Sequence, residues 1–196
     1  MSSDTDRLAR IRAAIGSEPR IRPTGRPIHL AFLGRDLLVE GEVDHIAGKK
    51  LALRAAARAS DADIVDRLHV RPAAPMGDGE IRTHLGDALL GEPVLADCAI
   101  AAWNGERLEA IRDPEGATGR IEIRVQDGVV TLDGEVAGLG RKRFAGVLAW
   151  WVPGSRDVVN GLGVSPPETD DDGAITDTVR QVLEKDPLVA SAAIEV

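Results

Sequence analysis

The chain has 196 residues, a formal net charge of −8, 43% hydrophobic residues and only 3% aromatic residues. This apolar content excludes global disorder, and the scarcity of aromatic residues requires an aliphatic core. The acidic balance disfavours nucleic acid, or an anionic membrane, as a partner of the whole surface. Cys98 is the only cysteine, so no intramolecular disulfide can form.

The start of the chain lacks an apolar run of the kind found in signal peptides, and no later segment is long enough to span a bilayer. These features predict a protein that stays in the cytoplasm and reaches a membrane only at its inner face.

The first patterned region covers residues 5–71. Asp6–Ile15 has the apolar spacing of a short amphipathic helix. Gly34-Arg35-Asp36 is suited to a hairpin turn, and a second helix and a strand near Ile64 are expected to follow it. The region is therefore predicted to contain a helix, a hairpin, a second helix and a strand.

A proline-rich joint, 71–75, leads to a second region at 77–165. A helix is predicted over Asp78–Leu90. The segment 103–119 is interpreted as an insertion, in which Asn104-Gly105 can turn an additional hairpin.

The second region is organised around residues 120–164. A strand with one buried face is predicted by the alternating residues Ile121, Ile123 and Val125. Asp127-Gly128 suits a tight hairpin turn, helical spacing covers Arg141–Trp151, and Pro153-Gly154 ends that helix. The predicted inward-facing set is Ile121, Ile123, Val125, Val130, Leu132, Leu148, Ala149 and Val158.

Within this stretch, glycines, valines and alanines follow one another in a recognisable order. They are Asp127-Gly128-Val129-Val130-Thr131-Leu132-Asp133-Gly134-Glu135-Val136, Ala145, Ala149, Val152-Pro153-Gly154 and Val158-Val159-Asn160. This order resembles the BON domain, a small module of bacterial envelope and osmotic-stress proteins. The resemblance implies an α+β fold, with helices on one face of a small mixed sheet, and a module that binds phospholipid.

Internal matches predict that the module is repeated. Gly41-Glu42-Val43 matches Gly134-Glu135-Val136, and segment 79–100 matches 173–194 without a gap. The expected organisation is BON-like repeat 1 at 5–71, BON-like repeat 2 at 77–165, an acidic linker at 166–172 and a partial third repeat at 173–196. We expect the partial repeat to pack on repeat 2 or to be mobile. Its stop before a hairpin suggests a fragment of a longer protein.

Basic residues occupy the first turn of two predicted helices, where a helix dipole usually favours acidic ones. They are Arg141, Lys142 and Arg143 in repeat 2, and Lys49 and Lys50 in repeat 1. Cations beside exposed backbone N–H groups are candidates for binding an anion or a phosphate. The alternative is an ordinary solvated charged face.

Trp150 and Trp151 are the second candidate feature. A helical wheel places Trp150 opposite the core side and Trp151 on the flank. An exposed tryptophan beside basic residues suits a membrane interface or a protein contact. The alternative is that another segment of the chain covers both rings.

The sequence favours neither catalysis nor a metal or cofactor site. No Gly-x-Ser-x-Gly motif is present, and no two histidines have the spacing of a helical metal site. Cys98 is expected to be a small buried residue at the start of a strand.

Two functions are therefore considered. The first, which the resemblance implies, is a non-enzymatic, membrane-associated module of the bacterial stress response that binds phospholipid or another envelope component. The alternative is a cytoplasmic protein-interaction scaffold, or a homo-oligomer, that needs no lipid. The candidate ligand-binding residues are Arg141, Lys142, Arg143, Trp150, Trp151, Lys49 and Lys50.

Overall fold

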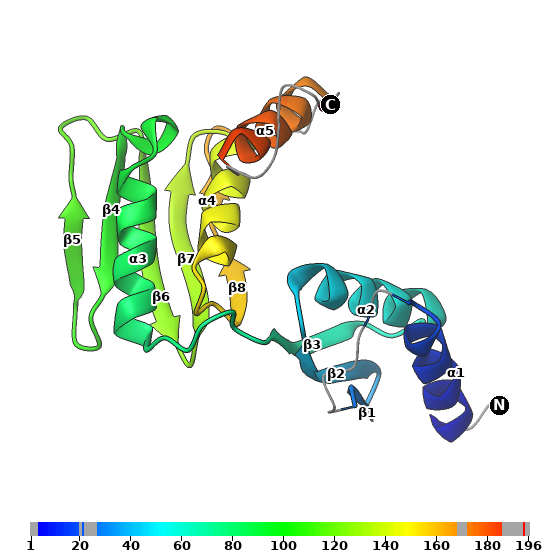
Figure 1. Cartoon of the computed structure of the whole chain (residues 1–196). Helices are drawn as coiled ribbons and strands as arrows, with labels where there is room; N and C mark the ends of the chain where they lie inside the picture. The colour runs from blue at the N-terminus through cyan, green and yellow to red at the C-terminus, as the bar shows by residue number, and fades with distance from the viewer. Residues whose placement is uncertain (1–3, 20, 22–26, 168–171, 186–193, 195–196) are drawn as a thin grey trace. The chain divides into compact units, whose positions relative to one another are not determined.

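A computed structural model describes residues 4–19, 21, 27–167, 172–185 and 194. The chain divides into two compact units, 1–71 and 72–196 (Figure 1). The division falls in the proline-rich joint. No helix among the described residues is long and apolar enough to cross a bilayer.

The first unit has the element order helix, two strands, helix, strand. Its elements are α1 (Asp4–Gly16), β1 (His29–Leu33), β2 (Asp36–Val43), α2 (Ile46–Ala59) and β3 (Ile64–Val70). β1 and β2 form an antiparallel hairpin around Gly34-Arg35, whereas β2 and β3 are parallel. A parallel pair needs a crossover, which α2 supplies. The predicted order of elements is confirmed.

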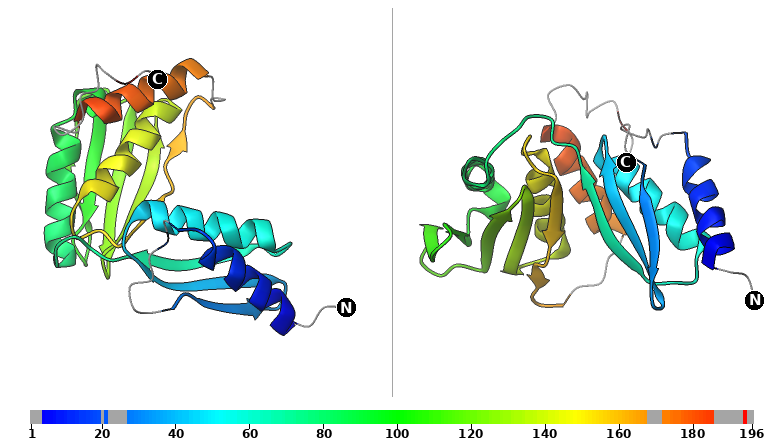
Figure 2. Two further views of the ribbon diagram at one scale, coloured as in Figure 1. Left: turned by 45° about the vertical axis from the view of Figure 1, so that its right-hand side comes forward. Right: turned by 90° about the horizontal axis from the view of Figure 1, so that it is seen from below.

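The second unit contains the same order with additional strands. Its elements are α3 (Asp78–Leu90), the 3-10 turn η1 (Pro93–Leu95), β4 (Cys98–Trp103), β5 (Leu108–Arg112), β6 (Gly119–Gln126), β7 (Val129–Val136), α4 (Leu139–Trp151), β8 (Asp157–Asn160), β9 (Gly163–Val164) and α5 (Asp172–Lys185). The sheet order is β5-β4-β6-β7-β8, and β9 also pairs with β7. α3 and α4 cover the same face of this sheet (Figures 1 and 2). The predicted α+β class with mixed sheets is confirmed.

β4 and β5 form the additional hairpin that Asn104-Gly105 predicts. The side-chain oxygen of Asn104 accepts hydrogen bonds from the backbone N–H groups of Glu106 and Arg107. β4 then pairs in parallel with β6, so the hairpin widens the sheet rather than standing apart from it.

The turn between β6 and β7 is held from outside the hairpin. The carboxylate of Asp78, in the first turn of α3, accepts hydrogen bonds from the backbone N–H groups of Asp127 and Gly128 at 2.9 and 2.8 Å. Both turn residues have positive φ, 52° and 75°, which is why an Asp-Gly pair suits this position.

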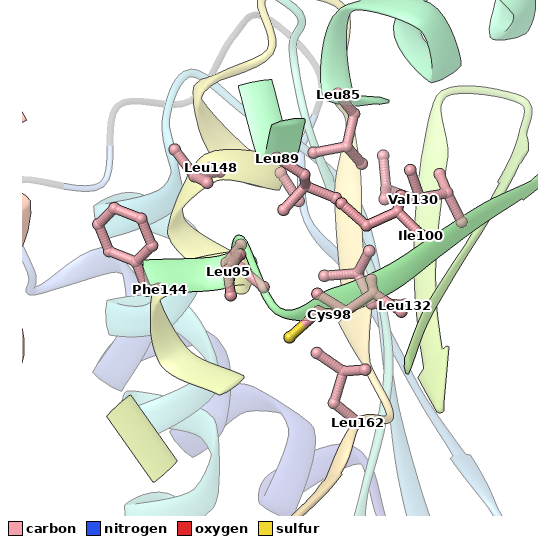
Figure 3. Packing of buried hydrophobic residues seen from close by; sticks show 14 of the residues in the cluster. Leu85, Leu89, Leu95, Cys98, Ile100, Val130, Leu132, Phe144, Leu148 and Leu162 are labelled. Atoms are coloured by element: carbon pink, nitrogen blue, oxygen red, sulfur yellow. The ribbon is translucent and has the colours of Figure 1, made fainter. Parts of the chain in front are cut away.

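The core of the second unit is aliphatic apart from Phe144 and Cys98 and lies between the helices and the sheet (Figure 3). All eight residues of the predicted inward-facing set belong to it or pack against it. After α4 the chain pairs with β7 in two separate strands, because β8 ends at Asn160 and β9 begins at Gly163. Between them, the backbone N–H of Gly161 donates to the Leu132 carbonyl, and the Leu162 side chain enters the core.

The segment predicted to be a partial third repeat contains most of α5, which packs against α4 (Figure 1). Thr178 is 7% exposed and lies close to Gly140 of α4. Residues 186–193 and 195–196 of the same segment lie outside the described residues.

The two matched glycines share a positive backbone φ. Gly41 in β2 and Gly134 in β7 both have positive φ, 142° and 111°. A Cβ on Gly134 would lie 2.3 Å from the backbone oxygen of Arg120 on the paired strand β6. This position therefore needs glycine both for its backbone angle and for the close approach of the strands.

We predict that Gly134→Ala lowers the free energy of unfolding by at least about 2 kcal/mol, since strain from positive φ adds to a clash between backbones. Gly105→Ala is the matched control: its φ is 107°, and nothing lies within 4 Å of the added Cβ. The control should lose only about 1 kcal/mol. Urea unfolding of both variants measures the difference, and equal losses would contradict the role of the clash.

Candidate functional site

The helix α4 carries five of the seven candidate residues. Its inner face is buried through Phe144, Ala145, Leu148 and Ala149, as the helical wheel predicts. Its outer face, defined by Arg143, Val147 and Trp150 at helical spacing, is half-buried.

The two tryptophans differ in exposure. Trp151 is 44% exposed, whereas Trp150 is half-buried. The wheel singled out Trp150 as the residue opposite the core, so the more exposed ring is the one expected on the flank. A wheel gives the direction of a side chain only, and exposure also depends on what packs beside the helix.

The side chain of Arg141 extends from the start of α4 to residues that directly precede β4 and β6. Its guanidinium lies 2.9 Å from the carboxylate of Asp97 and donates to the hydroxyl of Thr118 at 3.2 Å. The Thr118 hydroxyl also donates to Asp97. This Asp97–Thr118–Arg141 cluster ties the start of α4 to the segments that precede β4 and β6.

The cluster lowers the pKa of Asp97 below its ordinary value of 3.8, chiefly through the hydrogen bond from Thr118 and then through Arg141, against a partial desolvation that raises it. Burial instead raises the pKa of the adjacent Cys98 thiol. Cys98 is fully buried at the start of β4, as expected.

The other basic candidates differ in how far their side chains are exposed. Lys49 is only 5% exposed, and its ammonium lies 3.0 Å from the carboxylate of Asp66 on β3. Lys50, the next residue, is exposed, while Lys142 and Arg143 are half-exposed. Arg141 and Lys49 therefore each form an ion pair within their own unit.

Two features were not anticipated from the sequence. Trp103, at the end of β4, is 38% exposed and lies 5.7 Å from the guanidinium of Arg124, in cation–π geometry. His45 caps α2, where its Nδ1 accepts a hydrogen bond from the backbone N–H of Gly48. The position of His45 directly before the helix could have predicted this cap. No group of three potential metal ligands occurs among the residues that the structure describes.

The element order and the two helices on one sheet face define the second unit as a small α+β module of helix, hairpin, helix and strand, widened by one hairpin. Residues 108–166 match the BON domain family, so the chain contains a BON domain in this unit. The family match does not extend to the first unit, which shares the element order.

No curated protein matches the chain. Among solved structures, the C-terminal domain of CdsD, a structural protein of the type III secretion system of Chlamydia trachomatis, is 12% identical with a TM-score of 0.25, covering 84% of this chain and 100% of that chain. A second CdsD structure is 12% identical with a TM-score of 0.23, covering 93% and 99% of the two chains.

We predict that the Asp97 ion pair makes stability depend on pH. Because the pKa is lowered in the folded state, the pair stabilises the fold above pH 3.8, and this contribution is lost as the pH falls through the lowered pKa. Asp97→Asn should cost less than about 1 kcal/mol at pH 7, since the side chains are 41% and 24% exposed. Urea unfolding from pH 7 to pH 3 checks this.

The matched control is Asp113→Asn, at an exposed position in the loop after β5. Its effect should be near zero throughout that range. An Asp97→Asn deficit that persists unchanged at the lowest pH would contradict the electrostatic origin.

Proposed function

We propose that the protein is a non-catalytic binding module whose ligand is a phospholipid headgroup or another anionic envelope component. The observation that carries the proposal is the BON domain at residues 108–166, which is generally a non-catalytic binding module with proposed affinity for phospholipid. We assign the binding surface within this domain to Arg143, Trp150 and Trp151. These three residues are called the α4 outer surface below.

The chemistry of these side chains suits the edge of a bilayer. An indole ring combines an apolar body with one N–H donor and prefers the headgroup level. A guanidinium pairs with phosphate oxygens through parallel hydrogen bonds. Arg143 and Trp150 are seven residues apart on one side of α4, or about 10 Å along the helix axis. Trp151, at 44% exposure, is the ring most accessible to a ligand.

Lys142 is assigned a supporting role, and Lys50, in the first unit, is assigned a separate and weaker contact. Lys142 lies in the same helix, with a half-exposed side chain, and Lys50 is exposed in the first unit. Each would add roughly 1 kcal/mol of attraction near an anionic surface. Arg141 and Lys49 are left out of the proposed ligand surface, because only 24% of the Arg141 side chain and 5% of Lys49 are exposed.

The proposal requires contact with a membrane surface and no insertion across it. The net charge of −8 repels an anionic surface as a whole, so the attraction must be local to the α4 outer surface. Such binding would weaken with salt, because exposed charges are screened. We propose that this binding takes place at the inner face of the membrane. The same proposal includes a role in the stress response.

The second candidate function is a protein-interaction scaffold without lipid. It is favoured by the acidic net charge and by apolar side chains exposed on α5, where Ile175 and Val179 are 41% and 38% exposed. An exposed apolar patch on a helix is typical of a protein contact.

We predict that tryptophan emission shifts to the blue when the protein meets vesicles of phosphatidylglycerol and phosphatidylcholine, and that salt reverses the shift. Trp151→Ala should abolish most of the response. Arg143→Gln should weaken vesicle affinity about fivefold, the equivalent of about 1 kcal/mol per cation near the surface.

Trp103→Ala is the matched control, because Trp103 is 38% exposed but belongs to β4, outside the α4 outer surface. This variant should keep the lipid response. An unchanged spectrum with anionic vesicles would overturn the lipid proposal and leave the scaffold function as the better account.

A further inference from the structure

The strand β1 of the first unit corresponds to β6 of the second. Each is the first strand of a hairpin whose second strand carries one of the matched glycines, Gly41 or Gly134. A Cβ on Gly41 would lie 3.5 Å from the Cα of Ile28, and a Cβ on Gly134 would lie 3.7 Å from the Cα of Ile121. Ile28 therefore occupies in the first unit the position that Ile121 occupies in the second.

The outer edge of β1 is open, whereas that of β6 is covered. In the second unit, β4 pairs in parallel with β6 and places Ile100 opposite Ile121. Among the residues that the structure describes, β1 pairs with β2 alone and is the outermost strand of its sheet (Figure 1). The edge of a sheet presents backbone N–H and C=O groups that a further strand can pair with. The first unit therefore offers, at β1, the edge that β4 occupies on β6.

An apolar hollow of about 270 Å³ lies beside this edge. Its lining includes apolar residues at the end of α1, on β1 and at the end of β2, namely Ile15, Ile28, Leu30 and Val43. The residues at the same places in the second unit are Leu89, Ile121, Ile123 and Val136, and their core also contains Leu95, Cys98 and Ile100 from η1 and β4. Ile121 is 0% exposed, while Ile28 is only half-buried. The hollow thus corresponds to the space that β4 and the turn before it fill in the second unit.

The chain contains a second segment with the pattern of β4. The ungapped match between 79–100 and 173–194 places Pro187, Val189, Ala192 and Ile194 on the positions of Pro93, Leu95, Cys98 and Ile100. Alternate residues of 192–196 are apolar, which is the pattern of a strand with one buried face. Ile194 is 45% exposed, whereas its counterpart Ile100 is 0% exposed. The segment therefore carries the apolar side chains that the hollow lacks.

We propose that segment 187–196 of a second copy of this chain adds in parallel to the outer edge of β1 and places Ile194 against Ile28 in the hollow. The added strand would complete the sheet of the first unit as β4 completes that of the second. The proposal does not depend on lipid binding, because the α4 outer surface belongs to the other unit.

The backbone and the charge both favour this occupant. An open strand edge is satisfied by an extended chain, and neither a helix nor a bilayer surface pairs with it. Basic residues outnumber acidic ones in 1–71, whereas acidic residues outnumber basic ones two to one in 72–196. Opposite charges on the two parts attract the first part of one copy to the second part of another. The resulting contact joins two different surfaces, so it passes from copy to copy in one direction.

The test is a disulfide between two copies of the full chain. Ala101 lies opposite Glu122 in the β4–β6 pair, and the residues at the same places are Glu195 in the segment and His29 in β1. Two preparations, His29→Cys and Glu195→Cys, are mixed in a glutathione buffer, and mass spectrometry identifies the linked peptides. The native Cys98 is fully buried, so it contributes little.

The matched control replaces His29→Cys by Leu33→Cys. Leu33 is exposed on the same strand but lies four residues, or about 13 Å, further along it. The disulfide with Glu195→Cys should form at least about tenfold faster for His29→Cys, because docking raises the effective concentration of one thiol at the other.

A second pair of variants tests the hollow. Ile194→Asp, added to the Glu195→Cys chain, should remove the rate advantage, since a carboxylate in an apolar hollow loses its hydration. Ala193→Asp, on the opposite side of the same strand, should keep it. Ile194 is exposed in the unpaired chain, so neither change is expected to unfold the protein.

Three outcomes would overturn the proposal. One is an equal rate for His29→Cys and Leu33→Cys. Another is an equal rate for Ile194→Asp and Ala193→Asp. The third is a disulfide that forms within single chains of the His29→Cys/Glu195→Cys double variant at a rate independent of protein concentration, which would assign the β1 edge to the segment of the same chain.

Discussion

The second unit depends on the packing of two helices against the inner face of one hairpin. With Phe144 as the only aromatic residue in the core cluster, burial must come from many aliphatic side chains, each contributing on the order of 1.5–3 kcal/mol when fully buried. The position of the hairpin relative to α3 is therefore critical. Asp78 holds the β6–β7 turn against the start of α3 through two backbone hydrogen bonds. The helix α3, which covers one face of the sheet, thus also holds the turn between β6 and β7.

Charge at the start of α4 has two separate uses. A cation in the first turn is unfavourable beside the positive end of the helix dipole, and Asp97 offsets this for Arg141 with a carboxylate 2.9 Å away. Lys142 and Arg143 lie on other sides of the helix because successive residues are rotated by about 100°. One run of basic residues therefore contributes an internal ion pair and a half-exposed pair of side chains.

The parts of the fold that local pattern dictates were predictable. Alternation predicted β6, Asp127-Gly128 predicted the turn, and the change to helical spacing predicted α4. The parallel pairing of β4 with β6 was not predictable from local pattern, because it joins strands separated by the whole insertion. The burial of Lys49 was missed for the same reason. Its partner Asp66 lies on β3, which follows α2 in the sequence. Without knowledge of that partner, a lysine in the first turn of a helix is expected to be exposed to solvent.

The comparison of α3 with α5 separates what an amphipathic pattern specifies from what it does not. Both helices carry apolar residues at three matched positions, yet Ile81 is 0% exposed and Ile175 is 41% exposed. The matched positions are Ile81, Leu85 and Leu89 in α3 and Ile175, Val179 and Leu183 in α5. The pattern fixes which face of a helix is apolar, since side chains three and four positions apart share a face. Whether that face is buried depends on a second element that the helix itself does not encode. In α3 the second element is the sheet, and in α5 contact with α4 covers only the neighbouring surface. An apolar stripe on a helix therefore does not by itself specify the element that covers it.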